Sequence, residues 1–241
     1  WGGNISVLAK KRSTIESLAG GMGGSGSGSF GGAVSVNFIH DRTLADVRVT
    51  GKVNAAGDFV IGADNSATVK TLAVAGGASS GSAVSASVAY TQIGSATGGD
   101  SDIADGDHGD EQRDAVIALA NSENKQGADL SSGVDETNAV LTANSNLSGV
   151  PEITARSVAV TATDTSTIKS LAGSVAGAST AGVGAALSLN SYHGSTNAIV
   201  AANGTVRFAT TGAGAAGGLT VRARNEATIS TLAGALGAGG T

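Results

Sequence analysis

Thr14-Ile15-Glu16-Ser17-Leu18-Ala19-Gly20 is the stretch that decides the fold, because variants of it return three more times along the 241 residues. The further copies are Thr68-Val69-Lys70-Thr71-Leu72-Ala73, Thr167-Ile168-Lys169-Ser170-Leu171-Ala172-Gly173 and Thr228-Ile229-Ser230-Thr231-Leu232-Ala233-Gly234. Their first residues are 54, 99 and 61 positions apart. Repetition at this spacing is typical of stacked units that bury one another's faces.

Two further segments recur within each unit. The first alternates small and apolar residues: Ala33-Val34-Ser35-Val36-Asn37 and Ala186-Leu187-Ser188-Leu189-Asn190, with Ala83-Val84-Ser85-Ala86-Ser87 as a weaker middle copy. The second closes the unit, in residues 57–63, 156–162 and 218–223. A period of two places alternate side chains on one face, which predicts strands. Helices are disfavoured because each interior Gly costs a helix about 0.5–1 kcal/mol relative to Ala.

Three strand blocks per unit predict an all-β fold, a parallel β-solenoid in which one unit forms about three coils of roughly 18–20 residues each. The usual handedness of parallel crossovers predicts a right-handed solenoid. The chain carries 38 Gly, and its aromatic residues make 3% of the sequence, so the core must be thin and filled by small side chains. The absence of Cys excludes a disulfide scaffold and cysteine-ligated metal sites.

Glycine-rich runs follow the repeated Thr phrases, at residues 20–26, 73–77 and 173–178. The first run lacks the Lys-Ser/Thr ending of a phosphate-binding loop, so a nucleotide site is not expected. We expect instead a row of tightly packed strands, because Gly lets backbones approach closely. No apolar stretch reaches the roughly 18 residues of a membrane helix, and because no basic region followed by an apolar run opens the chain, we expect no signal peptide in these residues. The repeated text at both ends suggests a fragment of a longer protein.

One segment does not belong to the repeat. The second unit is 99 residues long, and the excess predicts three parts: solenoid repeats in 1–97, an acidic insertion in 98–136, and continued repeats in 137–241. The text resumes near Asn138-Ala139-Val140-Leu141, which matches Asn197-Ala198-Ile199-Val200. The insertion holds 11 of the 19 acidic residues and two bases, a net charge of −9. This charge argues against a nucleic-acid partner, which requires a basic face.

The insertion carries two candidate features. Residues 110–121 predict one short helix with Asp110 as N-cap, which either covers the shaft or binds a partner. A run of carboxylates could bind Ca²⁺, a hard ion that prefers oxygen ligands. The candidate ligands are Asp100, Asp102, Asp105, Asp107, Asp110 and Glu111, and His108 in the same loop is either a further ligand or an exposed side chain without such a role. The alternative is a solvated acidic loop, because the loop lacks the Gly that the known Ca²⁺-loop pattern requires at its sixth position. No other cofactor is expected.

Four residues occupy matching places in the first and last complete units. His40 and His193 follow the alternating segments, and we expect them at turns, too far apart to share a metal. Asn37 and Asn190 are expected to satisfy backbone groups at a corner of the coil.

The repeated phrases resemble repeats of giant bacterial filamentous adhesins, the leukotoxin-type and filamentous-haemagglutinin-like proteins exported by type V systems. Residues 37–60 carry the closest resemblance, which extends over everything outside 98–136. The resemblance implies an extracellular or bacterial cell-surface location and brings no catalytic residues. It favours a structural or adhesive shaft whose partners are neighbouring repeats, other copies of the chain, or a cell-surface or glycan ligand.

The alternative is a polysaccharide-acting β-helix enzyme, a lyase or epimerase. Such an enzyme needs several acids and a basic residue in one groove. The acids outside the insertion are instead scattered along the sequence: Asp41, Asp46, Asp58, Asp64 and Asp164. The sequence therefore favours a protein that is not an enzyme.

Overall fold

The computed structural model describes residues 3–94, 135–144, 151–203, 207–209 and 218–240, and every regular element in these ranges is a strand. The strands are β1 (Ile5–Ser25), β2 (Gly28–Ile39), β3 (Arg42–Val49), β4 (Lys52–Asn54), β5 (Asp58–Ser79), β6 (Ser82–Ile93), β7 (Asp135–Asn144), β8 (Glu152–Thr154), β9 (Ser157–Ala178), β10 (Ala181–Tyr192), β11 (Gly194–Asn203), β12 (Arg207–Ala209) and β13 (Leu219–Gly239).

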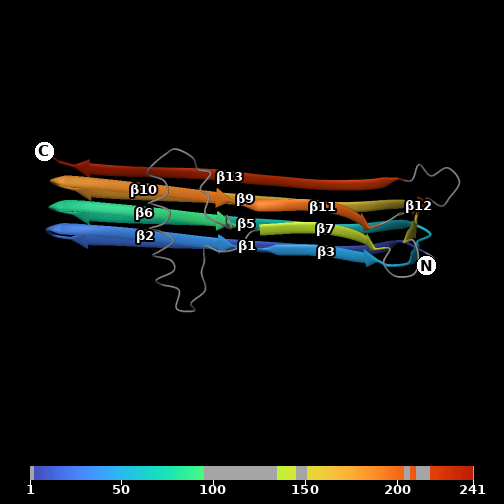
Figure 1. Ribbon diagram of the computed structural model, residues 1–241. Coiled ribbons are helices and arrows are strands. Elements are labelled where there is room, and N and C mark those ends of the chain that lie inside the picture. The colour runs from blue at the N-terminus through green and yellow to red at the C-terminus, as the bar shows by residue number, and fades with distance from the viewer. Residues whose placement is uncertain (1–2, 95–134, 145–150, 204–206, 210–217, 241) are drawn as a thin grey trace.

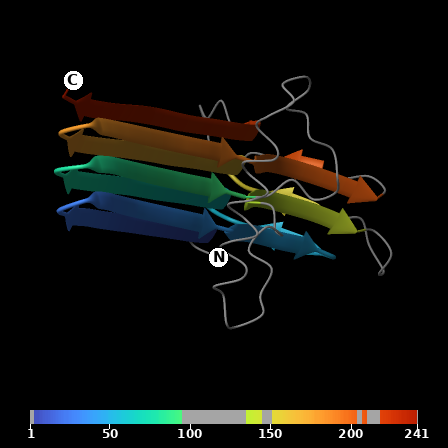
Figure 2. The same ribbon diagram turned by 90° about the vertical axis from the view of Figure 1, so that its left-hand side faces the viewer.

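The strands form four parallel sheets that run the length of the stack (Figure 1). Their orders are β1-β5-β9-β13, β2-β6-β10, β3-β7-β11 and β4-β8-β12. Each coil therefore contributes one strand to every sheet, and β13 begins a fourth coil. This arrangement confirms the predicted parallel β-solenoid, and Figure 2 shows the successive coils lying one above the other.

One repeat unit forms one coil, so the expectation of three coils per unit is wrong. The repeated phrases pair in register across the long sheet, as Thr14 pairs with Thr68, Thr68 with Thr167 and Thr167 with Thr228. The closing block, the Thr phrase and the Gly/Ala run form one continuous strand, which in β5 and β9 is 22 residues long. The coil is large because these three blocks are not separated by turns.

The pairing also tests the repeats on the other sheets. Asn138 pairs with Asn197 and Leu141 with Val200, which confirms the predicted match. The middle copy of the alternating segment is four residues later than predicted, because Ser87 pairs with both Ala33 and Ala186. Alternating Ala, Ser and Val resemble themselves when shifted by an even number of residues, so similarity alone could not fix this register.

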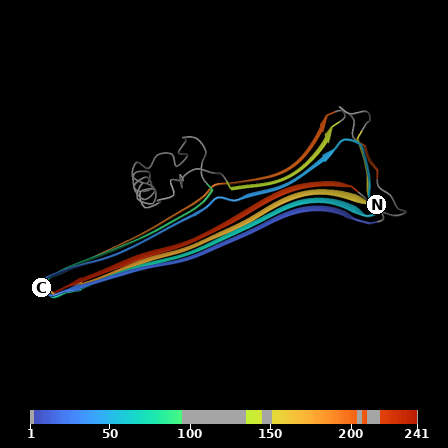
Figure 3. The same ribbon diagram turned by 90° about the horizontal axis from the view of Figure 1, so that it is seen from below.

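The cross-section is a wedge (Figure 3). The long sheet forms one side, the sheets of β2 and β3 form the other, and the short β4 sheet closes the wide end. Large apolar side chains fill the wide end: Phe59, Ile61, Leu141, Ile153, Val158 and Val160. Alanines fill the narrow end: Ala33, Ala73, Ala75, Ala89 and Ala172. The core is therefore thin only where the two sides converge.

At the narrow end the two layers meet through their backbones. A Cβ atom added to Gly21 would lie less than 3.0 Å from the carbonyl oxygen of Gly32, and one on Gly182 would approach Ala238 equally closely. The glycine-rich runs lie side by side in β1, β5 and β9, as predicted. The close approach that requires Gly is between opposed sheets and not between neighbouring strands of one sheet.

Candidate functional surfaces

The predicted Ca²⁺ ligands lie outside the described residues, which omit 95–134. The same holds for His108 and for the predicted helix at 110–121, so both features of the insertion stay predictions. Within the described residues, no three His, Asp or Glu side chains lie close enough together to hold a metal ion.

The insertion leaves the shaft between β6 and β7. The offset between the first two coils is 54 residues at Ile39–Ile93 and 94 at Arg42–Glu136, a difference of 40. The third coil gives the same difference, because the offset falls from 99 at Ile93–Tyr192 to 59 at Asp135–Gly194. Both neighbouring coils thus place 40 extra residues at this junction, the number in 95–134. The predicted end at Glu136 lies two residues inside the ladder of β7.

The last residues of β6 anchor the exit point. Gly94 has a φ of 70°, which favours glycine, and its N–H donates to the carbonyl of Ile39 at 2.8 Å. The Gln92 amide donates to the Gly94 carbonyl at 2.8 Å, and the Tyr90 hydroxyl donates to Gln92 Oε1 at 2.6 Å. Tyr90 and Gln92 are both buried. The chain therefore enters the insertion from a fixed position.

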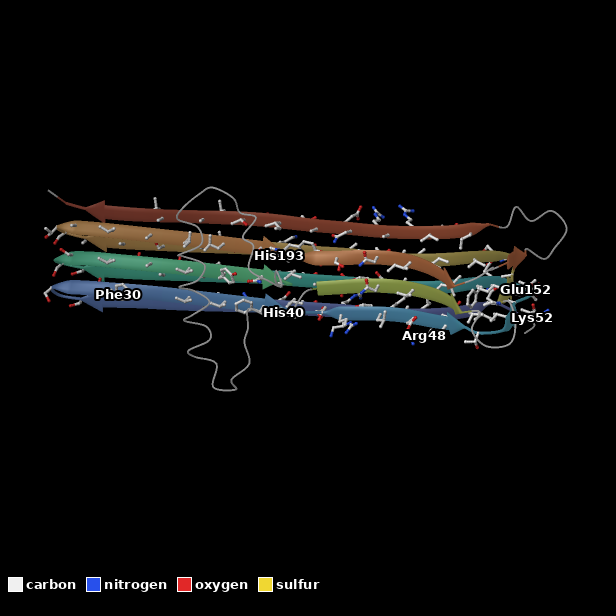
Figure 4. All side chains as sticks on the ribbon, viewed as in Figure 1. Phe30, His40, Arg48, Lys52, Glu152 and His193 are labelled. Carbon is white, nitrogen blue, oxygen red and sulfur yellow. The ribbon has the colours of Figure 1, made fainter. Side chains whose placement is uncertain are left out.

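His40 and His193 lie at this same junction in the first and third coils (Figure 4). Each falls between two strands of its coil, and the N–H of His193 donates to the Ile93 carbonyl at 2.8 Å. Neighbouring strands are about 4.8 Å apart, so the two strand spacings between the first and third coils separate the histidines by roughly 10 Å along the stack. His193 Nε2 lies 2.7 Å from the Ser191 hydroxyl, and the ring of His40 meets the ring of Phe38 edge-on.

Asn37 and Asn190 do not sit at a corner, so that expectation is wrong. Asn37 points inward from within β2, two residues before the strand ends, and donates to the hydroxyls of Ser17 at 2.9 Å and Thr71 at 2.7 Å. Asn190 donates in the same way to Thr231 at 2.6 Å. Both amides connect the two layers of the wedge through side chains, because the backbone groups around them are engaged in the sheet ladders.

A buried carboxylate occupies the interior where the narrow and wide ends meet. Asp164, 1% exposed, accepts hydrogen bonds from the Asn65 amide at 2.8 Å, the Ser166 hydroxyl at 2.8 Å and the Tyr192 hydroxyl at 3.2 Å. Thr137 contributes a fourth donor at 3.3 Å. Several donors compensate the loss of water around this charge, so the cluster holds the second and third coils in register.

The outer surface carries cross-coil ion pairs. Lys70 donates to Glu16 at 2.7 Å, and this hydrogen bond, with the charge of Lys70, lowers the pKa of Glu16. The pKa of Asp58 is lowered by hydrogen bonds from Arg156 and Ser157, while Arg156 has its own pKa raised by Asp58. Lys52 pairs across coils with Glu152 at 3.2 Å, whereas Arg48 pairs with Asp46 within the single strand β3 (Figure 4). These pairs are exposed, so each contributes little to stability.

An open groove of about 640 Å³ crosses the outer face of the long sheet from β1 to β13. One wall is a row of leucines: Leu18, Leu72, Leu171 and Leu232. The opposite wall is polar: Glu16, Lys70, Lys169 and Ser230. The sequence repeats pointed to these rows, since every member lies in one of the four Thr phrases.

The five scattered acids do not converge. Asp164 and Asp41 lie inside, where Asp41 accepts from the Ser13 hydroxyl at 2.6 Å and pairs with Lys11. Asp46, Asp58 and Asp64 lie on the outside, the first two in the separate ion pairs described above. The wedge thus divides these carboxylates between its interior and its surface.

In the part of the chain that the structure describes, no helix is long and apolar enough to cross a membrane. Comparisons with protein-family models, with curated proteins and with solved structures found no match to this chain.

Proposed function

We propose that this chain is a structural shaft segment of a giant bacterial surface or secreted protein, and that it displays the acidic insertion from its side. The observation that carries the proposal is the register. Both coils that flank the insertion pair as they would without it, with 40 extra residues confined to one junction. A scaffold that carries an appendage needs this separation between ladder and loop.

The ladders explain how such a shaft would bear load. Strands of up to 22 residues are hydrogen-bonded to the coil above and the coil below, so the backbone bonds run along the axis of the stack. Pulling the ends apart must break many of these bonds together. The amides of Asn37 and Asn190 add connections between the two layers.

The proposed partners follow from the open surfaces. Ile229 in β13 is 48% exposed, whereas its equivalents Ile168 and Val69 are buried, so the face of β13 would accept a neighbouring repeat or another copy. A cell-surface or glycan ligand would bind the insertion. The resemblance to filamentous adhesins supports an extracellular location, which an antibody against the chain would test by labelling intact cells of the producing organism.

The alternative, a lyase or epimerase, needs acids and a base along one groove. The groove on the long sheet contains Glu16, whose carboxylate is paired with Lys70. Its other wall is made of leucines, which offer no proton transfer. The described residues therefore favour the shaft.

Deletion of residues 95–134 tests the proposal. The variant joins Gly94 to Asp135, which restores the two-residue link that His40 and Asp41 make between β2 and β3. We expect a folded shaft with the same β-sheet circular dichroism and one cooperative unfolding transition.

Deletion of 98–136 is the matched control. It removes Asp135 and Glu136 from the ladder of β7 and leaves one residue too many before Thr137, so its unfolding midpoint should be lower. If the 95–134 deletion unfolds the chain, the insertion is part of the core and the shaft proposal fails.

A further inference from the structure

The outer face of the long sheet is a regular array of ridges and grooves near the narrow end. We call it the ridge face and define it by four rows that cross β1, β5, β9 and β13. The rows are Leu18, Leu72, Leu171 and Leu232; Gly20, Val74, Gly173 and Gly234; Met22, Gly76, Val175 and Leu236; and Gly24, Ala78, Gly177 and Ala238. The large side chains are exposed, apart from the half-buried Leu72, with Met22 at 93% and Leu18 at 75%. This is a contiguous apolar surface facing water.

Four glycines of the ridge face are not required by any close contact within the chain. A Cβ atom added to Gly24, Gly173, Gly177 or Gly234 would meet nothing within 4 Å. The inward glycines of the same strands differ, because Gly21 and Gly23 face the backbone of the opposed sheet. Glycine lowers the stability of a strand, and these outward glycines have no contact within the chain that requires their small size. We therefore look for that requirement in a binding partner.

The rows are complementary to themselves. Consider a second copy related by a two-fold axis parallel to the stack, passing between the rows of Gly20 and Met22. Residue 18 then faces residue 24 of the second copy, residue 20 faces 22, and the later coils follow the same rule. All eight pairings set a large side chain against a small one: Leu18–Gly24, Leu72–Ala78, Leu171–Gly177, Leu232–Ala238, Met22–Gly20, Val74–Gly76, Val175–Gly173 and Leu236–Gly234.

We propose that the ridge face binds a second copy of this chain, face to face, with the ridges of each copy in the grooves of the other. The charged row of Glu16, Lys70 and Lys169 would then face the turns at the tip of the second copy and stay at the solvated rim. Charges at the rim and apolar residues at the centre are the usual anatomy of a protein interface.

The size and shape of the face suit this partner. Eight residues of four strands cover about 26 by 19 Å, or roughly 500 Å² on each copy. The total of about 1,000 Å² is the lower bound for a specific interface, so the dimer should be weak with this number of coils. The strands of the long sheet lie nearly over one another along the stack (Figure 3), so matched rows can stay aligned across all four strands.

Sedimentation over a range of concentrations tests the proposal. The chain should pass reversibly from monomer to dimer, and Gly173→Leu with Gly177→Leu should weaken the dimer at least tenfold by filling the grooves. Circular dichroism and the unfolding midpoint of this variant should not fall, because the added side chains meet open space. Thr163→Leu on β9 is the control, since it places a leucine on the outer side of the same strand outside the ridge face and should leave the dimer intact.

Cross-linking tests the arrangement without filling the grooves, and the absence of native Cys makes the reaction specific. Copies with Leu171→Cys mixed with copies with Gly177→Cys should be joined by a bis-maleimide of about 10 Å, the separation of packed sheets. Two copies with Thr163→Cys should not be joined.

A chain that stays monomeric at millimolar concentration overturns the proposal. So does a dimer that Gly173→Leu with Gly177→Leu does not weaken, or a dimer in which Leu171→Cys and Gly177→Cys are not cross-linked. The shaft proposal does not depend on either result, because it is tested by the register of the deletion variant.

Discussion

The position of a glycine along the long sheet decides what the residue does. Odd-numbered glycines of β1, such as Gly21, point toward the opposed layer, and even-numbered ones, such as Gly24, point to solvent. The first group allows backbones to touch, while the second shapes an outer surface. A count of 38 Gly therefore combines two physical requirements.

Gly21→Ala and Gly24→Ala should separate these roles. The Cβ atom that Gly21→Ala adds would overlap the Gly32 carbonyl, so the layers must move apart and we expect a loss of about 1–3 kcal/mol, typical of overpacking. The Cβ atom that Gly24→Ala adds meets nothing within 4 Å, so this change should be neutral or stabilise by up to about 1 kcal/mol, because Ala restricts the unfolded chain. Urea unfolding of both variants measures the difference, and equal losses would refute the close approach.

Asp164→Ala should strongly destabilise the fold. The change removes the acceptor of Asn65, Ser166 and Tyr192, and each buried donor that stays unsatisfied costs about 1–3 kcal/mol. Thr167→Ala, an outward position on the same strand, is the control. A midpoint in urea no lower than that of the control would mean that the cluster contributes nothing to stability.

The burial of Asp164 could have been predicted from its position in the strand, although the polar residues around it suggest a surface position. Asp164 stands among Thr and Ser residues, as in a typical surface-exposed segment. It nevertheless shares even-numbered positions with Val158, Val160 and Ile168, whose side chains point inward. Strand parity thus predicts its burial. Its partners could not be predicted, because Asn65 comes from the neighbouring coil and Tyr192 from the opposed layer of the same coil, and both contacts depend on a register that only the pairing reveals.

At the scale of elements, the sequence predicted the strands and most of the strand pairings but not the length of the coil. The repeated Thr phrases pair with one another in register, because equivalent residues of successive repeats occupy equivalent positions in neighbouring strands. The number of coils per unit was wrong because the prediction gives each strand block its own coil of roughly 18–20 residues, while in β5 the closing block, the Thr phrase and the Gly-rich run continue as one strand. The acidic insertion has no counterpart in the other units, so the repeat pattern gives no information on its structure. That structure stays a prediction.

The ion pair at the start of β5 should give the fold a dependence on acidity. The pKa of Asp58 lies below its ordinary value of 3.8 because Arg156 and Ser157 donate to the carboxylate. A carboxyl with a lowered pKa stabilises the folded state above the unfolded pKa, and this contribution is lost as the pH falls through the folded pKa. The gap in urea midpoint between the unmodified chain and Asp58→Asn should stay constant from pH 7 to 5 and shrink below 3.8.

Asp64→Asn provides the comparison for this experiment, because Asp64 is an exposed carboxylate on the same strand. Its difference from the unmodified chain should vary less over the same interval. A constant gap for Asp58→Asn at every pH would show that the pair with Arg156 does not form in solution.

The whole molecule is a one-dimensional stack, so the stability of each coil depends on its neighbours. Strands β5 and β9 are paired on both sides, whereas β1 and β13 are paired on one side only. The inner face of β13 is exposed, and Ile229 shows the contrast with the buried Ile168 of β9. Stability should therefore decrease from the middle of the stack toward its ends.

Amide hydrogen exchange measures this gradient directly. Amides of β5 and β9 should exchange slowest, near the rate set by global unfolding, and those of β13 at least about tenfold faster, because β13 can separate without opening the cores of the other coils. The ridge-face variant Gly173→Leu with Gly177→Leu is the control for dimer formation, since it should show the same gradient at every concentration. Equal protection of β9 and β13 in that variant would mean that the coils unfold as one unit, and the stack would then behave as a globular domain.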